Sequence, residues 1–202
     1  MSVGEFWPEK GVVSNEWVLN RRDSAPASLS GGSIAVPLGE PYWTIDVTVE
    51  VPQRSLLARN WSSFFARREG RKNTFTANRS FQSFPFAGGE PLPSIHFSFL
   101  DRPTGRVTLR DIGTYRATEG DMVGWFTAQS GYYIGETKGV RFTNSSAAGL
   151  NLAPPPFGEH PSTPAIRLIK PVGEFRLDAV PAPVERSSQR TWSFKATQVI
   201  RG

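Results

Sequence analysis

The chain has 202 residues, a net charge of +5 and no cysteine. This length suits one large β domain or two small ones, with a core that forms without covalent staples. The lack of cysteine excludes disulfides, thiolate metal ligands and thiol nucleophiles, and two histidines are too few for a histidine-rich metal site. Glycine (19) and proline (17) are abundant and 12% of the residues are aromatic, which is typical of many short strands joined by tight turns.

Residues 1–41 predict an irregular N-terminal arm, because proline, glycine and serine recur in LNRRDSAPASLSGGSIAVPLGEPYW. Residues 42–202 then form a single β-rich domain. Its first strand is YWTIDVTVEVP, in which apolar and polar residues alternate. Met1 is not followed by a charged leader and an apolar run, and no apolar stretch has the length that a bilayer requires. We therefore expect a soluble protein, made in the cytoplasm, without a membrane anchor.

One helix is predicted at about residues 53–69. The apolar residues that share one of its faces are Leu57, Trp61, Phe64 and Phe65. Gly70 stands where a left-handed residue commonly ends a helix, and Arg67 and Arg68 lie in the last turn, where cations complement the helix dipole.

Short strands are predicted along the rest of the chain. They are NTFTAN, SIHFSFL, RVTLRDIG, two or three strands in EGDMVGWFTAQSGYYIGETKGVRFTN, then GLNLA, FRLDAV and QRTWSFKATQVI. Residues 82–105 are rich in proline and glycine and predict a loop insertion. A lone helix among many strands usually covers the open face of a sandwich or barrel, so the fold is expected to be mainly β with one flanking helix.

The sequence contains no catalytic signature such as GxSxG, a P-loop or HExxH. Asp101, Asp111, Glu119 and Asp121 have the character of surface carboxylates on β-loops. His96 is expected on the solvent face of a strand, and His160 lies in a proline-rich loop. We therefore expect a protein that is not an enzyme, with no metal and no cofactor.

The basic helix has three interpretations. Its arginines, with Arg71 and Lys72, would suit phosphate contacts, but a recognition helix usually needs a second helix or a zinc site to hold it. Aromatic residues over a basic face also suit an interfacial membrane helix. We favour packing of Leu57, Trp61, Phe64 and Phe65 on the sheet, because burying each large side chain contributes about 2–3 kcal/mol.

Two stretches resemble a pattern in the tail-tip proteins of long-tailed bacteriophages. In that family a strand ending in proline leads to a W-x-x-F-L helix and then to L-x-G-R-x-G-x-F. The first set of matching positions is Trp61, Phe64, Phe65, Gly70, Arg71 and Phe75, whereas Arg68 and Asn73 depart from the usual leucine and glycine. The second set is Gly120, Asp121, Gly149, Leu150, Pro154 and Pro155. The resemblance covers about residues 42–200.

The resemblance implies a siphophage distal tail protein, or a related baseplate hub protein, with a β-sandwich or barrel of the tail-tube type. Such proteins form hexameric rings in the virion that join the tail tube to the hub and tip fibres, and DNA passes through the lumen without specific binding. On that basis the loops at 22–41, 82–94 and 153–165 become arms that lie on neighbouring subunits. Phe6, Trp7 and Trp17 become aromatic residues that a partner covers. We expect the segment that carries them to be poorly ordered before assembly.

Three alternatives stay open at this point. One is another tail component, such as a tube or terminator protein. A second is a carbohydrate-binding module for host attachment, in which Trp125, Tyr132 and Tyr133 stack on sugars. The third is a DNA-binding protein whose affinity depends on Arg67 and Arg68 and falls steeply with salt.

Overall fold

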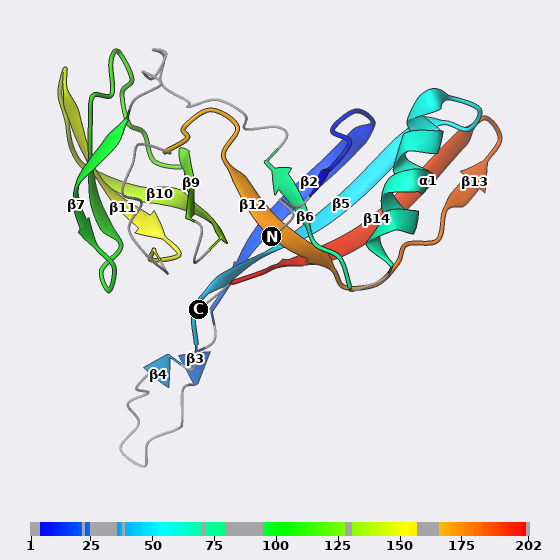
Figure 1. Ribbon diagram of the computed structural model, residues 1–202, viewed down its shortest axis with the longest axis horizontal. Helices are drawn as coiled ribbons and strands as arrows, with labels where there is room; N and C mark the ends of the chain where they lie inside the picture. The colour runs from blue at the N-terminus through cyan, green and yellow to red at the C-terminus, as the bar shows by residue number, and fades with distance from the viewer. Residues whose placement is uncertain are drawn as a thin grey trace.

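The computed structural model describes residues 5–21, 23–24, 36–37, 39–69, 72–79, 95–127, 131–156 and 166–200. Over these ranges the protein is mainly β, with one α-helix and two larger sheets at opposite ends of the long axis (Figure 1). A small ribbon of β3 (Asp23–Ser24) and β4 (Val36–Pro37) projects from one side. The prediction of a mainly β fold with one helix is confirmed.

The long sheet has the strand order β1-β6-β12-β14-β5-β2, and β13 also pairs with β14. The strands are β1 (Glu5–Phe6), β2 (Val12–Asn20), β5 (Tyr42–Pro52), β6 (Phe75–Asn78), β12 (Val172–Leu177), β13 (Val184–Arg186) and β14 (Gln189–Gln198). Strand β5 alternates as its sequence predicts, and Trp43, Ile45, Val47, Val49 and Val51 are buried on one face. This alternation gives the sheet one apolar face and one polar face.

Helix α1 (Leu56–Arg68) covers the apolar face of the long sheet. It begins at Ser55, whose side chain accepts a hydrogen bond from the backbone N–H of Ala58 at 3.1 Å. The left-handed residue at its end is Glu69, with φ of 46°, so the assignment of the cap to Gly70 is wrong. Gly70 itself lies outside the described residues.

The apolar side of α1 is buried as a cluster of aromatic rings. Trp61, Phe64 and Phe65 have almost no exposed surface, and Leu57 is half-buried against them. The Trp61 ring packs edge-on against Trp7 at 6.2 Å and stacks on Phe65 at 5.6 Å. Its Nε1 donates to the carbonyl oxygen of Lys10 at 2.8 Å, so this one side chain joins the helix to the N-terminal segment.

The N-terminal segment is part of this sheet, so the prediction of an irregular arm is wrong for β1 and β2. Strand β1 pairs in parallel with β6, and β2 pairs antiparallel with β5. A register shift between Val12 and Ser14 interrupts the alternation of β2, which explains why its sequence does not read as a strand. Trp7 and Trp17 are both buried in the protein's own core, so neither needs a partner subunit to cover it.

The second sheet has the order β7-β8-β11-β10-β9 and curls around its own core (Figure 1). Its strands are β7 (His96–Asp101), β8 (Arg106–Arg110), β9 (Met122–Thr127), β10 (Gly131–Thr143) and β11 (Ala147–Ala153). Residues 95–105 provide its edge strand and a turn, so they do not form a loop insertion. Residues 82–94 of that predicted insertion lie outside the described residues.

The two sheets meet where β12 packs on β9 and β10. Trp43 Nε1 donates to the carbonyl oxygen of Ile134 at 3.1 Å across this junction. Gly173 allows the approach, because a Cβ at this position would lie 2.9 Å from Ile134 Cγ2. The junction is therefore tightly packed and fixes one sheet against the other.

We predict that Trp61→Ala destabilises the protein by about 3–5 kcal/mol, because it empties the centre of the aromatic cluster and leaves the Lys10 carbonyl oxygen without its donor. Leu56→Ala is the control on the same helix, since Leu56 is 71% exposed, and its effect should stay within about 0.5 kcal/mol. Urea unfolding measures both. Equal effects of the two substitutions would contradict this account of the helix.

Candidate functional site

The polar face of the long sheet is its most distinctive surface. Residues opposite one another on β2, β5 and β14 share this face, which is turned away from α1. Its side chains are Ser14, Glu16 and Val18 on β2, Thr44, Asp46, Thr48 and Glu50 on β5, and Thr191, Ser193, Lys195 and Thr197 on β14. We call this surface the hydroxyl face. It is partly or fully exposed throughout.

The hydroxyl face is acidic although the whole chain is basic. Glu16, Asp46 and Glu50 contribute three carboxylates to this face. Among the residues that β2, β5 and β14 contribute to it, Lys195 is the one cation. Lys195 lies 3.2 Å from Asp46 and neutralises it. Along β2, β5 and β14 the face therefore has more carboxylates than cations. Exposed arginines, with which proteins hold phosphates, lie only on the neighbouring strands, at Arg176 of β12 opposite Thr197 and at Arg186 of β13 opposite Gln189.

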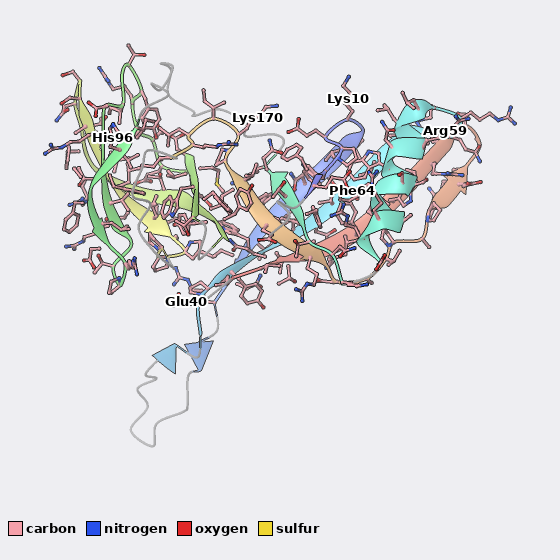
Figure 2. The ribbon with its side chains drawn as sticks, viewed as in Figure 1. Lys10, Glu40, Arg59, Phe64, His96 and Lys170 are labelled. Carbon is pink, nitrogen blue, oxygen red and sulfur yellow. The ribbon has the colours of Figure 1, made fainter. Side chains whose placement is uncertain are left out.

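The arginines near the long sheet lie mainly on its other side, with the helix. Arg59 extends from α1 into solvent, whereas Phe64 points toward the sheet (Figure 2). Arg190 of β14 donates to Ser62 of α1 at 3.5 Å, which places its guanidinium on the helix side. Charge is thus separated across the sheet, with arginine on the helix side and carboxylates on the hydroxyl face.

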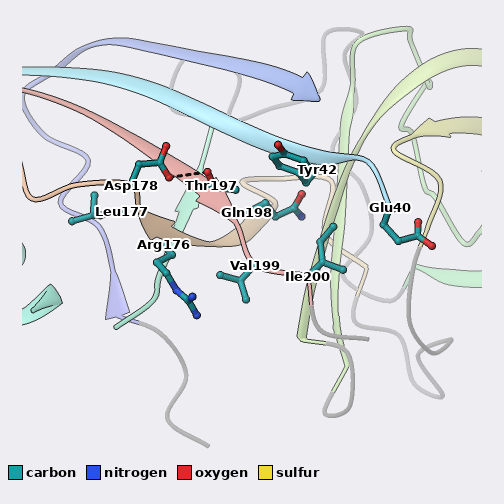
Figure 3. Close-up of a pocket in the computed structure, with 9 residues that line it drawn as sticks. All are labelled: Glu40, Tyr42, Arg176, Leu177, Asp178, Thr197, Gln198, Val199 and Ile200. Atoms are coloured by element: carbon teal, nitrogen blue, oxygen red, sulfur yellow. Dashed lines mark hydrogen bonds between the residues drawn. The ribbon is translucent and has the colours of Figure 1, made fainter. Parts of the chain in front are cut away.

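A groove of about 590 Å³ lies at one end of the hydroxyl face, where β12, β14 and the start of β5 converge (Figure 3). Its polar lining includes Glu40, Tyr42, Arg176 and Asp178. Asp178 Oδ1 accepts a hydrogen bond from Thr197 Oγ1 at 2.8 Å. Glu40 leads into the segment that carries the β3–β4 ribbon, so the groove lies at the base of that ribbon. The apolar part of its lining is Leu177, Val199 and Ile200, and this mixture of charged and apolar side chains suits a protein segment.

Arg68 has a structural position. It is buried at the end of α1, forms an ion pair with Glu5 of β1 and donates to the carbonyl oxygens of Phe64 and Thr74. Burial lowers the pKa of Arg68, and the Glu5 carboxylate opposes that shift. Arg67 also pairs with Glu5. These two arginines therefore fasten β1 to the helix, which weakens the DNA-binding interpretation.

Asp121, which also belongs to the resemblance to phage proteins, is a buried carboxylate in the second sheet's core, so the prediction that it lies on the surface is wrong. It accepts hydrogen bonds from the Tyr115 hydroxyl at 2.7 Å and from the backbone N–H of Thr118 at 2.9 Å. Burial raises the pKa of Tyr115, and the charge of Asp121 raises it further. Gly120 precedes it with φ of 90°, a left-handed conformation that favours glycine. The hydrogen bonds of Asp121 therefore stabilise the turn that leads into β9.

The other residues of the resemblance are also structural where they are described. Phe75 is buried in β6, with its ring 5.3 Å from that of Phe64. Gly149 lies in β11 directly under the ring of Phe142. The Pro154 carbonyl oxygen accepts from the Tyr133 hydroxyl at 2.7 Å. Gly70 and Arg71 lie outside the described residues.

The aromatic residues proposed for partner or sugar contacts are mostly internal. Of the three suggested subunit contacts only Phe6 is exposed, because Trp7 and Trp17 are buried. Trp125 and Tyr133 are buried as well and stack on each other at 3.9 Å, so the suggestion that they bind sugars is wrong. Burial raises the pKa of Tyr133. Tyr132 is partly exposed beside Phe126, with the two rings 4.8 Å apart.

No group of three metal-ligating side chains gathers anywhere in the described ranges. His96 is half-exposed on β7, with Nε2 at 3.7 Å from an Asp111 carboxylate oxygen, and His160 lies outside the described residues. Within the same part of the chain, α1 is too short and too polar to cross a membrane.

Sequence comparison gives no relative: neither the protein-family models nor the curated proteins include a match to this chain. The strand alternation already places Thr44, Asp46, Thr48 and Glu50 on one face. Their neighbours on β2 and β14 could not be foreseen, because the pairing joins segments far apart in the sequence. Thr48 and Ser193, for example, lie 3.4 Å apart across this face although 145 positions separate them.

We predict that Asp121→Ala destabilises the protein by about 3 kcal/mol, because it leaves the Tyr115 hydroxyl and the Thr118 N–H without their acceptor in a buried site. Asp101→Ala is the matched control. That carboxylate accepts from Thr104 at the surface, and its loss should cost no more than about 0.5 kcal/mol. Denaturant midpoints distinguish the two, and an unchanged midpoint for Asp121→Ala would refute the assigned role.

Proposed function

We propose that this chain is a structural ring protein at the tail tip of a long-tailed bacteriophage. In this role it joins the tail tube to the hub and tip proteins, and the ring encloses the channel through which DNA passes. It acts as a virion component, without catalysis or a cofactor. The observation that carries the proposal is the hydroxyl face, an exposed sheet surface rich in hydroxyl groups, with carboxylates and a single paired lysine. The order of the sequence motifs gives the phage context.

A channel wall for DNA has an unusual electrostatic requirement. DNA is held at its phosphates by Lys and Arg, so a wall that lets it slide has to present few unpaired cations. The hydroxyl face meets this requirement, whereas the helix side of the same sheet, with Arg54 and Arg59 exposed, does not. If the hydroxyl face lines the lumen, α1 lies on the outside of the ring.

Subunit contacts have available surfaces in this fold. No described strand pairs with the outer edge of β2, and Val13 and Val18 are exposed on this strand. An unpaired edge strand readily accepts another strand. The β3–β4 ribbon projects from the body, and a groove of about 590 Å³ lies at its base. These features support assembly by contacts between neighbouring copies.

One of the alternatives, another tail component, remains close to this proposal. A tube protein or a terminator protein would use a similar channel face but a different number of stacked layers. The carbohydrate-binding alternative loses its main support, because Trp125 and Tyr133 lie in the core and offer no surface to a sugar.

The first test of the proposal is the shape and mass of the purified protein. We expect closed rings with a central hole in negative-stain images, and a mass by light scattering near six times the 22.3 kDa of one chain. Filaments of indefinite length would favour a tube protein instead. A chain that stays monomeric alone and also after mixing with phage tail tubes would refute the proposal.

The channel face is tested by placing cations on it. Ser14→Lys with Ser193→Lys adds two charges per subunit on the hydroxyl face, and the control Asn60→Lys with Ser63→Lys adds two on the exposed side of α1. We expect assembled rings of the first variant to bind duplex DNA more tightly. The slope of log affinity against log salt concentration should become more negative by about 0.9 for each new phosphate contact. Equal binding of DNA by the two variants would show that the hydroxyl face does not line the channel.

A further inference from the structure

The outer, convex face of the second sheet carries an exposed aromatic row. Phe99 of β7, Thr108 of β8, Gly149 of β11 and Phe142 of β10 are paired in register across four adjacent strands. The core side chains, such as Val107 and Leu109, point to the other face of the same sheet. Phe99 is 49% exposed and Phe142 is 42% exposed, and Gly149 leaves room for the Phe142 ring to lie flat on the strand.

Arginines surround this row. Arg106 and Arg110 alternate with the buried residues of β8 and are exposed. The Arg141 guanidinium lies 5.9 Å from the centre of the Phe142 ring and donates to Thr108 Oγ1 at 3.2 Å. We call Phe99, Arg106, Arg110, Arg141 and Phe142 the convex patch. Small ligands bind in concave sites, so a convex patch of aromatic and cationic side chains suits a macromolecular partner.

A second exposed apolar surface lies between β12 and β13. Residues 179–184 read Ala-Val-Pro-Ala-Pro-Val, and Val180 and Val184 are 54% and 53% exposed. We call this the proline segment. A carboxylate lies at each end of it, but Glu185 pairs with Arg190 of the same chain and Asp178 accepts a hydrogen bond from Thr197. Two prolines restrict the free chain, so the segment loses little entropy when it docks, and proline side chains pack well on aromatic rings.

The two surfaces are complementary and lie at opposite ends of the molecule. The second sheet forms one end of the long axis, and the proline segment leads into β13 at the other (Figure 1). A surface that cannot meet its complement within one chain can meet it on the next chain. Contacts between different patches are heterologous, and they form rings when the rotation closes and filaments when it does not.

We infer that the proline segment of one copy docks on the convex patch of the next copy. Its prolines and valines lie against Phe99 and Phe142. The inference rests on the proposed ring, because it names the head-to-tail contact that such a ring requires. A second copy is favoured over other protein partners because the same chain carries both halves of the contact, an exposed aromatic surface at one end and an exposed proline segment at the other.

The test uses one variant for each half of the contact. Val180→Asp with Val184→Asp disables the proline segment, and Phe99→Glu with Arg106→Glu disables the convex patch. We expect each variant to be monomeric alone, and their equimolar mixture to stop at dimers near twice 22.3 kDa, because each dimer has one intact contact. Leu56→Asp with Ile169→Asp is the control, with two exposed apolar residues outside both surfaces replaced, and it should assemble like the wild type.

Cross-linking keeps the contact testable if the isolated protein does not form rings. The chain has no cysteine, so Val180→Cys and Thr108→Cys each introduce a single thiol. A bismaleimide should link the two variants when they are mixed, and neither variant to itself. Self-linking of Val180→Cys, or no linking in the mixture at high concentration, refutes the contact. If rings persist in the patch and segment variants, the contact is refuted but the proposed ring function is not. If the two cysteine variants are linked but the protein forms no rings on tail tubes, the ring function is refuted and the contact is not.

Discussion

The packing of Trp61 is the constraint on which the rest of the long sheet depends. Its ring contacts aromatic residues from the N-terminal segment, from its own helix and from β14, and its indole N–H binds the N-terminal backbone. Because these contacts fix α1 on one face, the opposite face of the sheet has no helix to cover it. An uncovered sheet face must be polar to stay in water, which is what the threonines, serines and carboxylates of β5 and β14 provide. The functional surface is thus a consequence of where the helix packs.

The N-terminal segment closes this arrangement. Trp7 fills the space beside Trp61, and Glu5 compensates the charge of the buried Arg68. An unpaired buried cation would be strongly unfavourable, so β1, α1 and β6 stabilise one another. The core therefore forms within one chain, and assembly joins surfaces that already exist. Preformed surfaces generally change little on docking, which makes the geometry of the single chain informative about its contacts.

Local patterns in the sequence predicted the elements with regular periodicity. Strand β5 alternates without a break, and α1 has an apolar stripe with cations at its end, so both were found nearly at their observed bounds. Strand β2 was missed because its bulge shifts the alternation by one residue, and Trp17 then looked like an exposed aromatic residue. The charge separation across the sheet depends on pairing β5 with β14, and no local pattern contains that information. The left-handed residue that ends the helix is Glu69 rather than the predicted Gly70, since a residue other than glycine can adopt this backbone conformation at a modest cost.

The uneven charge distribution connects these surfaces. A chain with a net charge of +5 would be expected to attract DNA over much of its surface. Here most of the cations beside the long sheet lie on the helix side, and another group belongs to the convex patch of the second sheet. On the opposite side of the long sheet Lys195 is paired with Asp46, and Arg176 and Arg186 lie at the border of the hydroxyl face. A head-to-tail contact would cover the convex patch with the proline segment of the next copy, and the helix would keep its arginines outside the ring. The remaining inward surface is the acidic hydroxyl face. The same distribution of charge is therefore compatible with assembly through the proposed contact and with passage of DNA along the hydroxyl face.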